Sequence, residues 1–528
     1  MSIAQPDRRR FVVASVLGAL AFLLFLEITA WRVAGVFEYP LDDVYIHLAM
    51  AEGLWAGSYG VNPGEISSAA SSVLYPVLLA PVISPEFQRL LPLFWNVAGL
   101  VLSAWLWAEV LLAAGYGRAG LRRVGLVLAA LGPIALQMPA VAFLGMEHAL
   151  HTAASLAILL GVIRHLKGQP ARGLLFAGIL FAPLLRYEGL GLVIAAAGVL
   201  LVTGQRRAAL SAVALGVVPL ALFSAFLMKN GLDPLPNSVL AKQVGATDTD
   251  LGSVAQRLAA FRRNIGQGGG ALVLGFVLGS WALYGLDARL RAGPMRWLAV
   301  FVIVAGLGHL AFGQIGWLNR YEHYILVITA GGFLVLLANS ALAENWRAGV
   351  LLGAAFSLVA PGVVYLREVT FGYRYNPRAI HLQQGQMARF AQDYWNAPVA
   401  VNDLGRVSWN NPNHVLDLWG LASPEALRLR LASQAGRGAP GGWADELTRK
   451  HGVRLVMAYE HWLGDAVGKD WVVLGDFWLD DRRGFLGSDR VRFYATDPDA
   501  VAQIMPALDE WVKTLDDGTN FQFAEVTR

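Results

Sequence analysis

Residues 1–366 are dominated by long apolar runs that are separated by short polar or charged links. A membrane-spanning helix needs about 20 consecutive apolar residues, and fewer where other protein shelters it. The further apolar run Ser72–Ile83 is predicted to be re-entrant or interfacial, because a full span there would place two basic links outside the membrane. Eleven other runs predict a polytopic α-helical membrane domain, and they lie near 11–33, 91–114, 124–143, 149–163, 173–185, 189–203, 208–228, 270–286, 297–313, 323–341 and 349–366.

The basic residues predict the orientation of these spans. Arg8, Arg9 and Arg10 precede the first run, which is longer than the core of a typical signal peptide and therefore predicts an uncleaved anchor with a cytoplasmic N-terminus. The chemically unusual segments then all lie on the outer face, which predicts an active site there. Every cytoplasmic link is short and basic, as the positive-inside rule requires, and these links contain Arg118, Arg122, Arg123, Arg164, Lys167, Arg172, Arg206, Arg207, Arg289, Arg291, Arg296 and Arg347.

Residues 367–528 differ in composition from the rest of the chain. About 24% of them are charged, against about 11% of residues 1–366 and about 25% in an ordinary soluble domain. Short β-rich runs alternate with predicted helices, which indicates a small extracytoplasmic α/β domain that covers the site or binds part of a substrate. The runs are Val399–Val401, Val453–Ala458, Trp471–Leu474 and Val491–Tyr494, and the helices are 380–394, 424–432, 443–450 and 499–514.

We therefore expect two domains. Residues 1–366 would form the membrane-embedded catalytic domain, with outer loops at 35–90 and 230–268, and residues 367–528 would form the soluble domain. The absence of cysteine rules out disulfides, thiol catalysis and thiolate metal sites. The soluble part shows no glycine-rich phosphate loop and no zinc-ligand spacing. The basic residues form topogenic clusters and not an aromatic-interleaved surface, so no nucleic-acid partner is expected.

The most informative polar segment, Glu38-Tyr-Pro-Leu-Asp-Asp-Val-Tyr-Ile-His47, directly follows the first span. Adjacent acids on an irregular segment point in different directions, so one of Asp42 and Asp43 can act as a base while the other orients it or holds a cation. A base that deprotonates a sugar hydroxyl must lie within hydrogen-bond distance of it. The alternative is that one acid caps the amphipathic helix Val44–Trp55, which explains one carboxylate well and two poorly.

Two Arg-Tyr-Glu triplets stand at the outer ends of predicted spans. They are Arg186-Tyr-Glu188 and Arg320-Tyr-Glu322, and His323 follows the second. Ionisable residues at membrane depth are costly and mark functional pathways. Because guanidinium groups bind phosphate in a bidentate manner, the two triplets could hold an anionic group. A purely structural contact between Arg186 and Glu188 is the alternative.

Two further outer segments contain candidate residues. In Asp233-Pro-Leu-Pro-Asn-Ser-Val-Leu-Ala-Lys242 the prolines keep the entry extended, and Lys242 is predicted to project from a loop as a point charge suited to phosphate. Simple solvation of this lysine is the alternative. In Gly145-Met-Glu-His148, Glu147 begins a span, and the dipole of the helix N-terminus stabilises a carboxylate at this position. That structural interpretation is preferred for Glu147.

Together these features resemble the GT-C superfamily of multispanning glycosyltransferases, and within it the terminal arabinofuranosyltransferases that use decaprenyl-phosphate arabinose. The resemblance covers nearly the whole chain. The Asp42-Asp43 pair alone is weak evidence for this family, whereas the pair together with the Pro-Asn…Ala-Lys and Arg-Tyr-Glu elements is specific for it. The matching stretches are Leu41-Asp-Asp-Val-Tyr-Ile, Ser67–Leu74, Gly145-Met-Glu, Leu185-Arg-Tyr-Glu-Gly, Leu235-Pro-Asn-Ser-Val-Leu-Ala-Lys, Asn319-Arg-Tyr-Glu-His-Tyr, Val401-Asn-Asp-Leu-Gly and Val415-Leu-Asp-Leu-Trp-Gly-Leu-Ala-Ser423.

The resemblance implies an inverting glycosyltransferase at the outer face of a bacterial inner membrane. It would move a sugar, with arabinofuranose as the lead, from a polyprenyl-phosphate donor to a glycan, glycolipid or protein acceptor. Asp42 or Asp43 would deprotonate the acceptor hydroxyl, and a divalent cation could lie between them, although no complete ligand set is visible. Lys242, Arg186 and Arg320 would stabilise the leaving phosphate. The implied sugar or acceptor pocket contains Tyr45, His47, Glu147, His148, Glu188, Asn237, Tyr321, Glu322 and His323.

Several alternatives stay open on the sequence alone. Mannose or another lipid-linked sugar could replace arabinofuranose, and either acid could be the base. A transporter or flippase for lipid-linked glycans would explain the spans and the outer cations, but not the acidic pair or the soluble domain. A ligase or polymerase of preassembled glycans is a closer alternative, although such enzymes usually depend on Arg and His in a large outer loop. In the glycosyltransferase interpretation, the acidic pair and the three cations should border one outer-face cavity that opens laterally to lipid.

Overall fold

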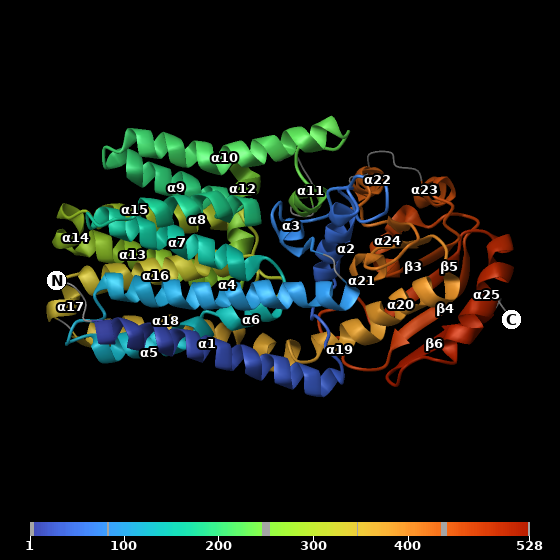
Figure 1. The fold of residues 1–528 in the computed structure, drawn as a ribbon, viewed down its shortest axis with the longest axis horizontal. Helices are drawn as coiled ribbons and strands as arrows, with labels where there is room; N and C mark the ends of the chain where they lie inside the picture. The colour runs from blue at the N-terminus through green and yellow to red at the C-terminus, as the bar shows by residue number, and fades with distance from the viewer. Residues whose placement is uncertain (1–4, 82–83, 245–253, 346, 435–440, 526–528) are drawn as a thin grey trace. The chain divides into compact units, whose positions relative to one another are not determined.

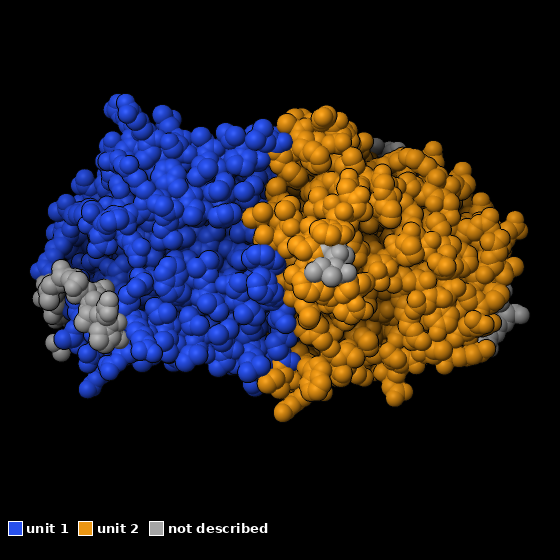
Figure 2. Space-filling model, in the orientation of Figure 1, with its two compact units in different colours: residues 1–27, 93–222, 250–370 blue, residues 28–92, 223–249, 371–528 orange. Residues whose placement is uncertain are grey.

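The computed structural model describes residues 5–81, 84–244, 254–345, 347–434 and 441–525. The chain forms two compact units, which are coloured separately in Figure 2. The first unit consists of Met1–Glu27, Leu93–Leu222 and Asp250–Thr370, and the second of Ile28–Pro92, Phe223–Thr249 and Phe371–Arg528. The whole of the predicted outer loop 35–90 and the first part of the loop 230–268 therefore belong to the same unit as the C-terminal residues.

The described part of the first unit contains helices and no strand (Figure 1). Helices α1, α4 and α10 continue beyond its boundaries into segments of the second unit. The helices are α1 (Gln5–Ala34), α4 (Pro85–Ala114), α5 (Arg122–Ala135), α6 (Met138–Phe143), α7 (His148–Leu166), α8 (Arg172–Leu185), α9 (Gly189–Val202), α10 (Arg206–Lys229), α12 (Val254–Ile265), α13 (Gly268–Leu286), α14 (Ala288–Ala292), α15 (Arg296–Phe312), α16 (His323–Asn339), α17 (Leu342–Asn345) and α18 (Arg347–Arg367).

Seven helices in the described part of the chain are long and apolar enough to cross a membrane. They lie within 7–34, 85–114, 122–143, 148–166, 206–229, 268–286 and 348–366, and four shorter apolar helices are α8, α9, α15 and α16. Each predicted span coincides with one of these segments, which confirms the polytopic helical fold class. That the four shorter helices also cross stays a prediction. In α10, Leu210 and Leu222 are 73% and 67% exposed, as expected of a helix whose apolar face meets lipid.

The predicted non-spanning run Ser72–Ile83 contains the short helix α3 (Tyr75–Leu79). Its five residues reach only about 8 Å along the helix axis, far less than the thickness of a bilayer core. The other helices of the second unit are α2 (Asp43–Trp55), α11 (Asn237–Val244), α19 (Asn376–Ile380), α20 (Gln386–Arg389), α21 (Gly405–Ser408), α22 (Pro424–Gln434), α23 (Ala444–Lys450), α24 (Glu460–Leu463) and α25 (Pro498–Val512). Short π-helical or 3₁₀ turns are η1 (Glu368–Gly372), η2 (His381–Gly385), η3 (Phe390–Trp395) and η4 (Gly464–Ala466).

A six-stranded mixed sheet lies at the centre of the second unit, with the strand order β2-β1-β3-β5-β4-β6. Strand β1 pairs in parallel with β2 and β3, whereas the β3–β5, β5–β4 and β4–β6 pairs are antiparallel. The four predicted β-rich runs correspond to β1, β3, β4 and β5, while β2 and β6 were not predicted. The strands are β1 (Val399–Val401), β2 (Val415–Asp417), β3 (Leu455–Ala458), β4 (Val472–Leu479), β5 (Arg490–Ala495) and β6 (Thr519–Phe523).

Successive residues of a strand face opposite sides of the sheet, and on strand β5 residues that face each side are buried. On β5, Phe493 stacks on Trp511 of α25, with ring centroids 5.7 Å apart. The next residue, Tyr494, faces the other way and packs in a core with Trp471 and residues of α22 and α23. The predicted α/β character of residues 367–528 is therefore confirmed.

Candidate active site

Asp42 stands directly before α2, but its side chain makes no capping bond to that helix. Its two carboxylate oxygens instead accept the backbone N–H groups of Gly405 and Arg406, at 2.6 and 2.7 Å. These amides form the N-terminus of α21, so a carboxylate of the segment between α1 and α2 is held by the start of a helix in the C-terminal part of the same unit. The capping alternative is therefore wrong for Asp42. Asp43 is the first residue of α2 and is partly exposed, whereas Asp42 is only 6% exposed.

A third carboxyl group, that of Asp403, forms a hydrogen bond with Asp42. Burial raises the pKa of Asp42 to about 6, although the amides of Arg406 and Gly405 and the bond from Asp403 favour its charged form. Burial, followed by the negative charge of Asp42, raises the pKa of Asp403 well above its usual range. The protonated form of Asp403 is therefore favoured beside the Asp42 carboxylate, and its O–H donates a hydrogen bond to that carboxylate. We call Asp42, Asp43 and Asp403 the acidic cluster.

Buried polar groups hold Asp403 in place. The side-chain amide of Gln384 donates to Asp403 Oδ2 at 2.7 Å and lies 2.7 Å from the hydroxyl oxygen of Tyr459. A methyl group in place of the α-hydrogen of Gly405 would lie only 2.0 Å from the backbone oxygen of Asp42, so only glycine permits this approach. From the sequence, Val401-Asn-Asp-Leu-Gly is only a matching stretch, and no role is predicted for Asp403.

Tyr45 is fully buried and contacts two charged side chains. Its hydroxyl donates to Glu38, which also pairs with Arg89 at 3.1 Å. The guanidinium of Arg406 lies over the Tyr45 ring, 5.2 Å from the centroid. Tyr45 thus links Glu38 to Arg406, and through that residue to the backbone that holds Asp42.

The remaining predicted residues of the second unit lie along α2 and α11. The Nε2 atom of His47 is 3.4 Å from Ser71 Oγ, and its ring packs on Tyr75. Asn237 is fully buried, and its backbone N–H donates to Ser68 Oγ at 3.1 Å. Lys242 lies in helix α11 and not on a loop as predicted, and its side chain is outside the described part of the structure. The phosphate role of Lys242 stays a prediction.

The first unit brings both Arg-Tyr-Glu triplets together. Arg186, between α8 and α9, pairs through its two terminal nitrogens with Glu147 and Glu188, each at 2.8 Å. The structural contact between Arg186 and Glu188 is therefore present, and Glu147 forms a second ion pair with the same guanidinium. The guanidinium carbons of Arg186 and Arg320 lie 5.7 and 5.3 Å from the ring centroid of Tyr321. One tyrosine ring thus contacts a cation from each triplet.

The other predicted residues of this group have structural partners. Glu322 accepts the backbone N–H of Gly316 at 2.8 Å and the hydroxyl of Tyr365 at 3.1 Å. Nδ1 of His323 lies 2.9 Å from Thr152 Oγ1 on α7, and His148 is buried at the start of that helix. The predicted site residues thus form one group in each unit. A single cavity shared by both groups stays a prediction, as does a cation between Asp42 and Asp43.

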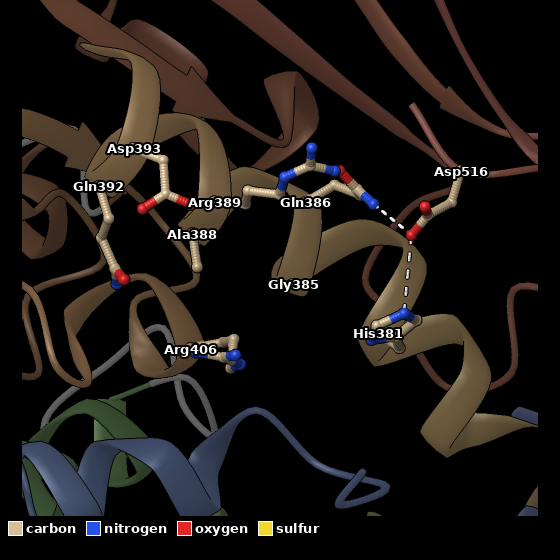
Figure 3. Close-up of a pocket in the computed structure, with 9 residues that line it drawn as sticks. All are labelled: His381, Gly385, Gln386, Ala388, Arg389, Gln392, Asp393, Arg406 and Asp516. Atoms are coloured by element: carbon tan, nitrogen blue, oxygen red, sulfur yellow. Dashed lines mark hydrogen bonds and ion pairs between the residues drawn. The ribbon is translucent and has the colours of Figure 1, made fainter. Parts of the chain in front are cut away.

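A polar cavity of about 330 Å³ lies within the second unit (Figure 3). One of its walls is Arg406, whose backbone N–H binds Asp42. On another wall, Asp516 accepts a hydrogen bond from Gln386 and lies 3.6 Å from His381. The lining includes donors such as Arg389 and Arg406 and acceptors such as Asp393 and Asp516, which suits a ligand with many hydroxyl groups. The other lining residues are Gly385, Ala388 and Gln392.

Comparison with known proteins establishes the fold. A family model described as a domain of unknown function (DUF8728) matches residues 374–494, and no curated protein matches the chain by sequence. The oligosaccharyltransferase of Archaeoglobus fulgidus, solved with zinc and sulfate, is similar over 92% of this chain and 73% of that one, with a TM-score of 0.53 and 13% identity. ArnT from Cupriavidus metallidurans is similar over 92% of this chain and 99% of that one, with a TM-score of 0.51 and 14% identity.

The chain has the fold of the polytopic GT-C membrane enzymes. This likeness confirms the GT-C resemblance at the level of architecture. The narrower resemblance, to arabinofuranosyltransferases, stays a prediction.

Proposed function

We propose that this GT-C-fold protein is an inverting glycosyltransferase that takes a sugar from a polyprenyl-phosphate donor at the outer face of a bacterial inner membrane. The observation that carries this proposal is the arrangement of the acidic cluster. One carboxylate, Asp42, is immobilised by two backbone amides and a protonated neighbour, while the adjacent Asp43 stands partly exposed at the first turn of α2. Such an arrangement gives a rigid support and an accessible base side by side.

Asp43 is the proposed base. Both oxygens of Asp42 already accept backbone N–H groups, and its side chain is nearly inaccessible, so Asp42 is a positioning residue. Asp43 removes the proton of the acceptor hydroxyl as its oxygen attacks the anomeric carbon of the donor. The bond between that carbon and the phosphate oxygen breaks, and polyprenyl phosphate leaves with the bonding electrons. A single displacement inverts the configuration at the anomeric carbon.

The leaving phosphate requires cations, and the arginines of the first unit are the proposed source. Arg186 is neutralised by two carboxylates, so its role is to position the group around Tyr321. Arg320 contacts the same ring and is the proposed phosphate ligand, with Lys242 as a second cation. ArnT has also been crystallised bound to undecaprenyl phosphate. That binding is a property of ArnT, and for this chain a polyprenyl donor is part of the proposal.

The polar cavity is the proposed binding site for the acceptor. Its volume of about 330 Å³ would hold one or two sugar rings, and Arg406 connects it to the acidic cluster. The acceptor is therefore a carbohydrate in this proposal, either a free glycan or the glycan part of a glycolipid or glycoprotein. The donor sugar is arabinofuranose, on the strength of the sequence resemblance alone.

Asp393→Ala tests the acceptor site. Asp393 lines the cavity and is exposed, so its carboxylate can accept hydrogen bonds from sugar hydroxyls. Because the side chain is exposed, its replacement by alanine should not disturb the packing of the protein. We expect the KM for the acceptor to rise about tenfold while the KM for the donor stays the same, because a hydrogen bond to a charged group contributes about 1.5 kcal/mol. Steady-state kinetics with each substrate varied in turn will measure both values. Asp470→Ala, at an exposed position outside the cavity, is the control; equal effects of the two variants would contradict this assignment.

The proposed function as a whole is tested by sugar transfer with the purified full-length protein in nanodiscs. The donors are decaprenyl-phosphate arabinofuranose and decaprenyl-phosphate mannose, each offered with a short glycan acceptor. Transfer from one donor with inversion supports the proposal and identifies the sugar. Donor movement between the leaflets of a vesicle without any transfer would instead favour a flippase.

A further inference from the structure

Three side chains from separate segments of the second unit gather away from the acidic cluster. Glu65 lies in the loop between α2 and α3, His414 directly precedes β2, and His451 directly follows α23. Each offers one atom able to bind a metal ion, and these three atoms lie within 4.8 Å of one another. They are the one such group among the residues that the structure describes. None of them takes part in the proposed transfer reaction.

The distances between these atoms suit a small cation. Nε2 of His414 is 2.9 Å from Glu65 Oε1, and Nδ1 of His451 is 3.9 Å from the same oxygen. Zinc binds imidazole nitrogen at about 2.0–2.1 Å, which places the ligand atoms of a tetrahedral site roughly 3.3 Å apart. Shifts of up to about 1.5 Å in these partly exposed side chains would therefore bring the observed distances to those of a zinc site.

A hydrogen bond explains only part of this arrangement. It accounts for His414 and Glu65, but His451 at 3.9 Å is too far from the carboxylate to donate to it. The two imidazole rings are stacked, with centroids 4.6 Å apart, and both direct a nitrogen toward the same oxygen. One cation between the three groups would bind both rings and the carboxylate once the imidazole rings rotate so that the lone pairs of both nitrogens point to it.

The carboxylate of Glu65 is oriented by a neighbour outside the group. Asn62 is buried, and its side-chain amide donates to Glu65 Oε2 at 3.0 Å. This bond turns the other oxygen, Oε1, toward the histidines. Outer partners of this kind orient the ligands of metal sites and raise their affinity.

We propose that Glu65, His414 and His451 bind a divalent transition-metal ion, with Zn²⁺ as the lead. Two imidazoles and one carboxylate are typical ligands of zinc. The side chains of Glu65, His414 and His451 are 41%, 20% and 24% exposed, so water can supply a fourth ligand. The ion would fasten the loop that follows α2 to strand β2 and helix α23. Its role is therefore structural.

Zinc binding by the full-length protein tests this site. The protein is prepared without a polyhistidine tag, stripped with a chelator, desalted and titrated with Zn²⁺ by calorimetry, and its thermal unfolding is recorded with and without the ion. We expect one high-affinity site and a rise of several degrees in the apparent Tm, because the folded state alone presents the three ligands together.

Two ligand variants and one control make the assignment specific. His451→Ala and Glu65→Gln should each weaken zinc binding at least tenfold and remove the rise in Tm. His461→Ala, at an exposed histidine outside the group, should behave like the wild type. The proposal is overturned if the wild-type protein takes up no zinc, or if both ligand variants bind zinc as tightly as the wild type. Glu65→Gln keeps the shape of the side chain, so it remains informative if His451→Ala fails to fold.

Discussion

Replacing Asp43 with Asn is expected to lower the rate of sugar transfer by a factor of about 10²–10⁴, the contribution typical of a general base. The substitution preserves the shape of the side chain and leaves the bonds of Asp42 to Gly405 and Arg406 in place, so folding should be unchanged. Initial rates with the preferred lipid-linked donor, together with thermal unfolding of the same preparation, will measure both quantities.

Asp42→Asn provides the contrast. An asparagine side chain has one acceptor oxygen, so its NH₂ group would face one of the two backbone N–H donors that the carboxylate now satisfies. We expect this variant to lose stability as well as activity. If Asp42→Asn instead keeps its stability and loses transfer, while Asp43→Asn remains active, Asp42 is the base and the two roles are exchanged.

Replacing Arg186 with Met is expected to destabilise the first unit by about 3–5 kcal/mol. The guanidinium forms ion pairs with Glu147, which is fully buried, and with Glu188. Removing it leaves two carboxylates near each other without their shared counter-charge, and the cost of an uncompensated buried charge is large. Chemical unfolding in detergent, followed by circular dichroism, will measure the loss.

Two further variants separate this effect from a general loss of positive charge. Arg172→Met removes an exposed arginine from the start of α8 and should change stability little. Arg186→Lys keeps the charge but cannot bind both carboxylates with one planar group, so it should recover only part of the stability. Equal stability of Arg186→Met and the wild type would show that the ion pairs contribute nothing to the fold.

The periodicity and length of apolar runs were sufficient to predict most of the fold. The eleven apolar runs coincide with helices because a lipid-facing or fully buried helix must be apolar along its whole length. Strands β2 and β6 were missed for different reasons. Strand β2 (Val415–Asp417) ends in a buried aspartate, and β6 (Thr519–Phe523) alternates polar residues with two phenylalanines at the edge of the sheet, so neither forms an apolar run.

The candidate site was less accessible to sequence reasoning. Local motifs indicated Asp42, Asp43 and Arg186, because charged groups stand out among apolar neighbours. Their partners depend on tertiary structure: Asp403 is 361 positions beyond Asp42, and Glu147 is separated from Arg186 by 39. The Val401-Asn-Asp-Leu-Gly stretch was the available signal for Asp403, but the sequence offers no way to connect it to the segment that contains Asp42.

The side chain of Asn62 also forms hydrogen bonds with the backbone of β2 at the edge of the sheet. Its amide donates to the backbone oxygen of Val415 and its oxygen accepts the N–H of the same residue, at 3.1 and 2.9 Å. Strand β2 is the last strand on its side of the sheet, and an open edge of this kind can pair with another chain. Residues 371–528 expressed without the loop that contains Asn62 would lack these two hydrogen bonds at the edge, so we expect this fragment to aggregate more readily than the full-length protein.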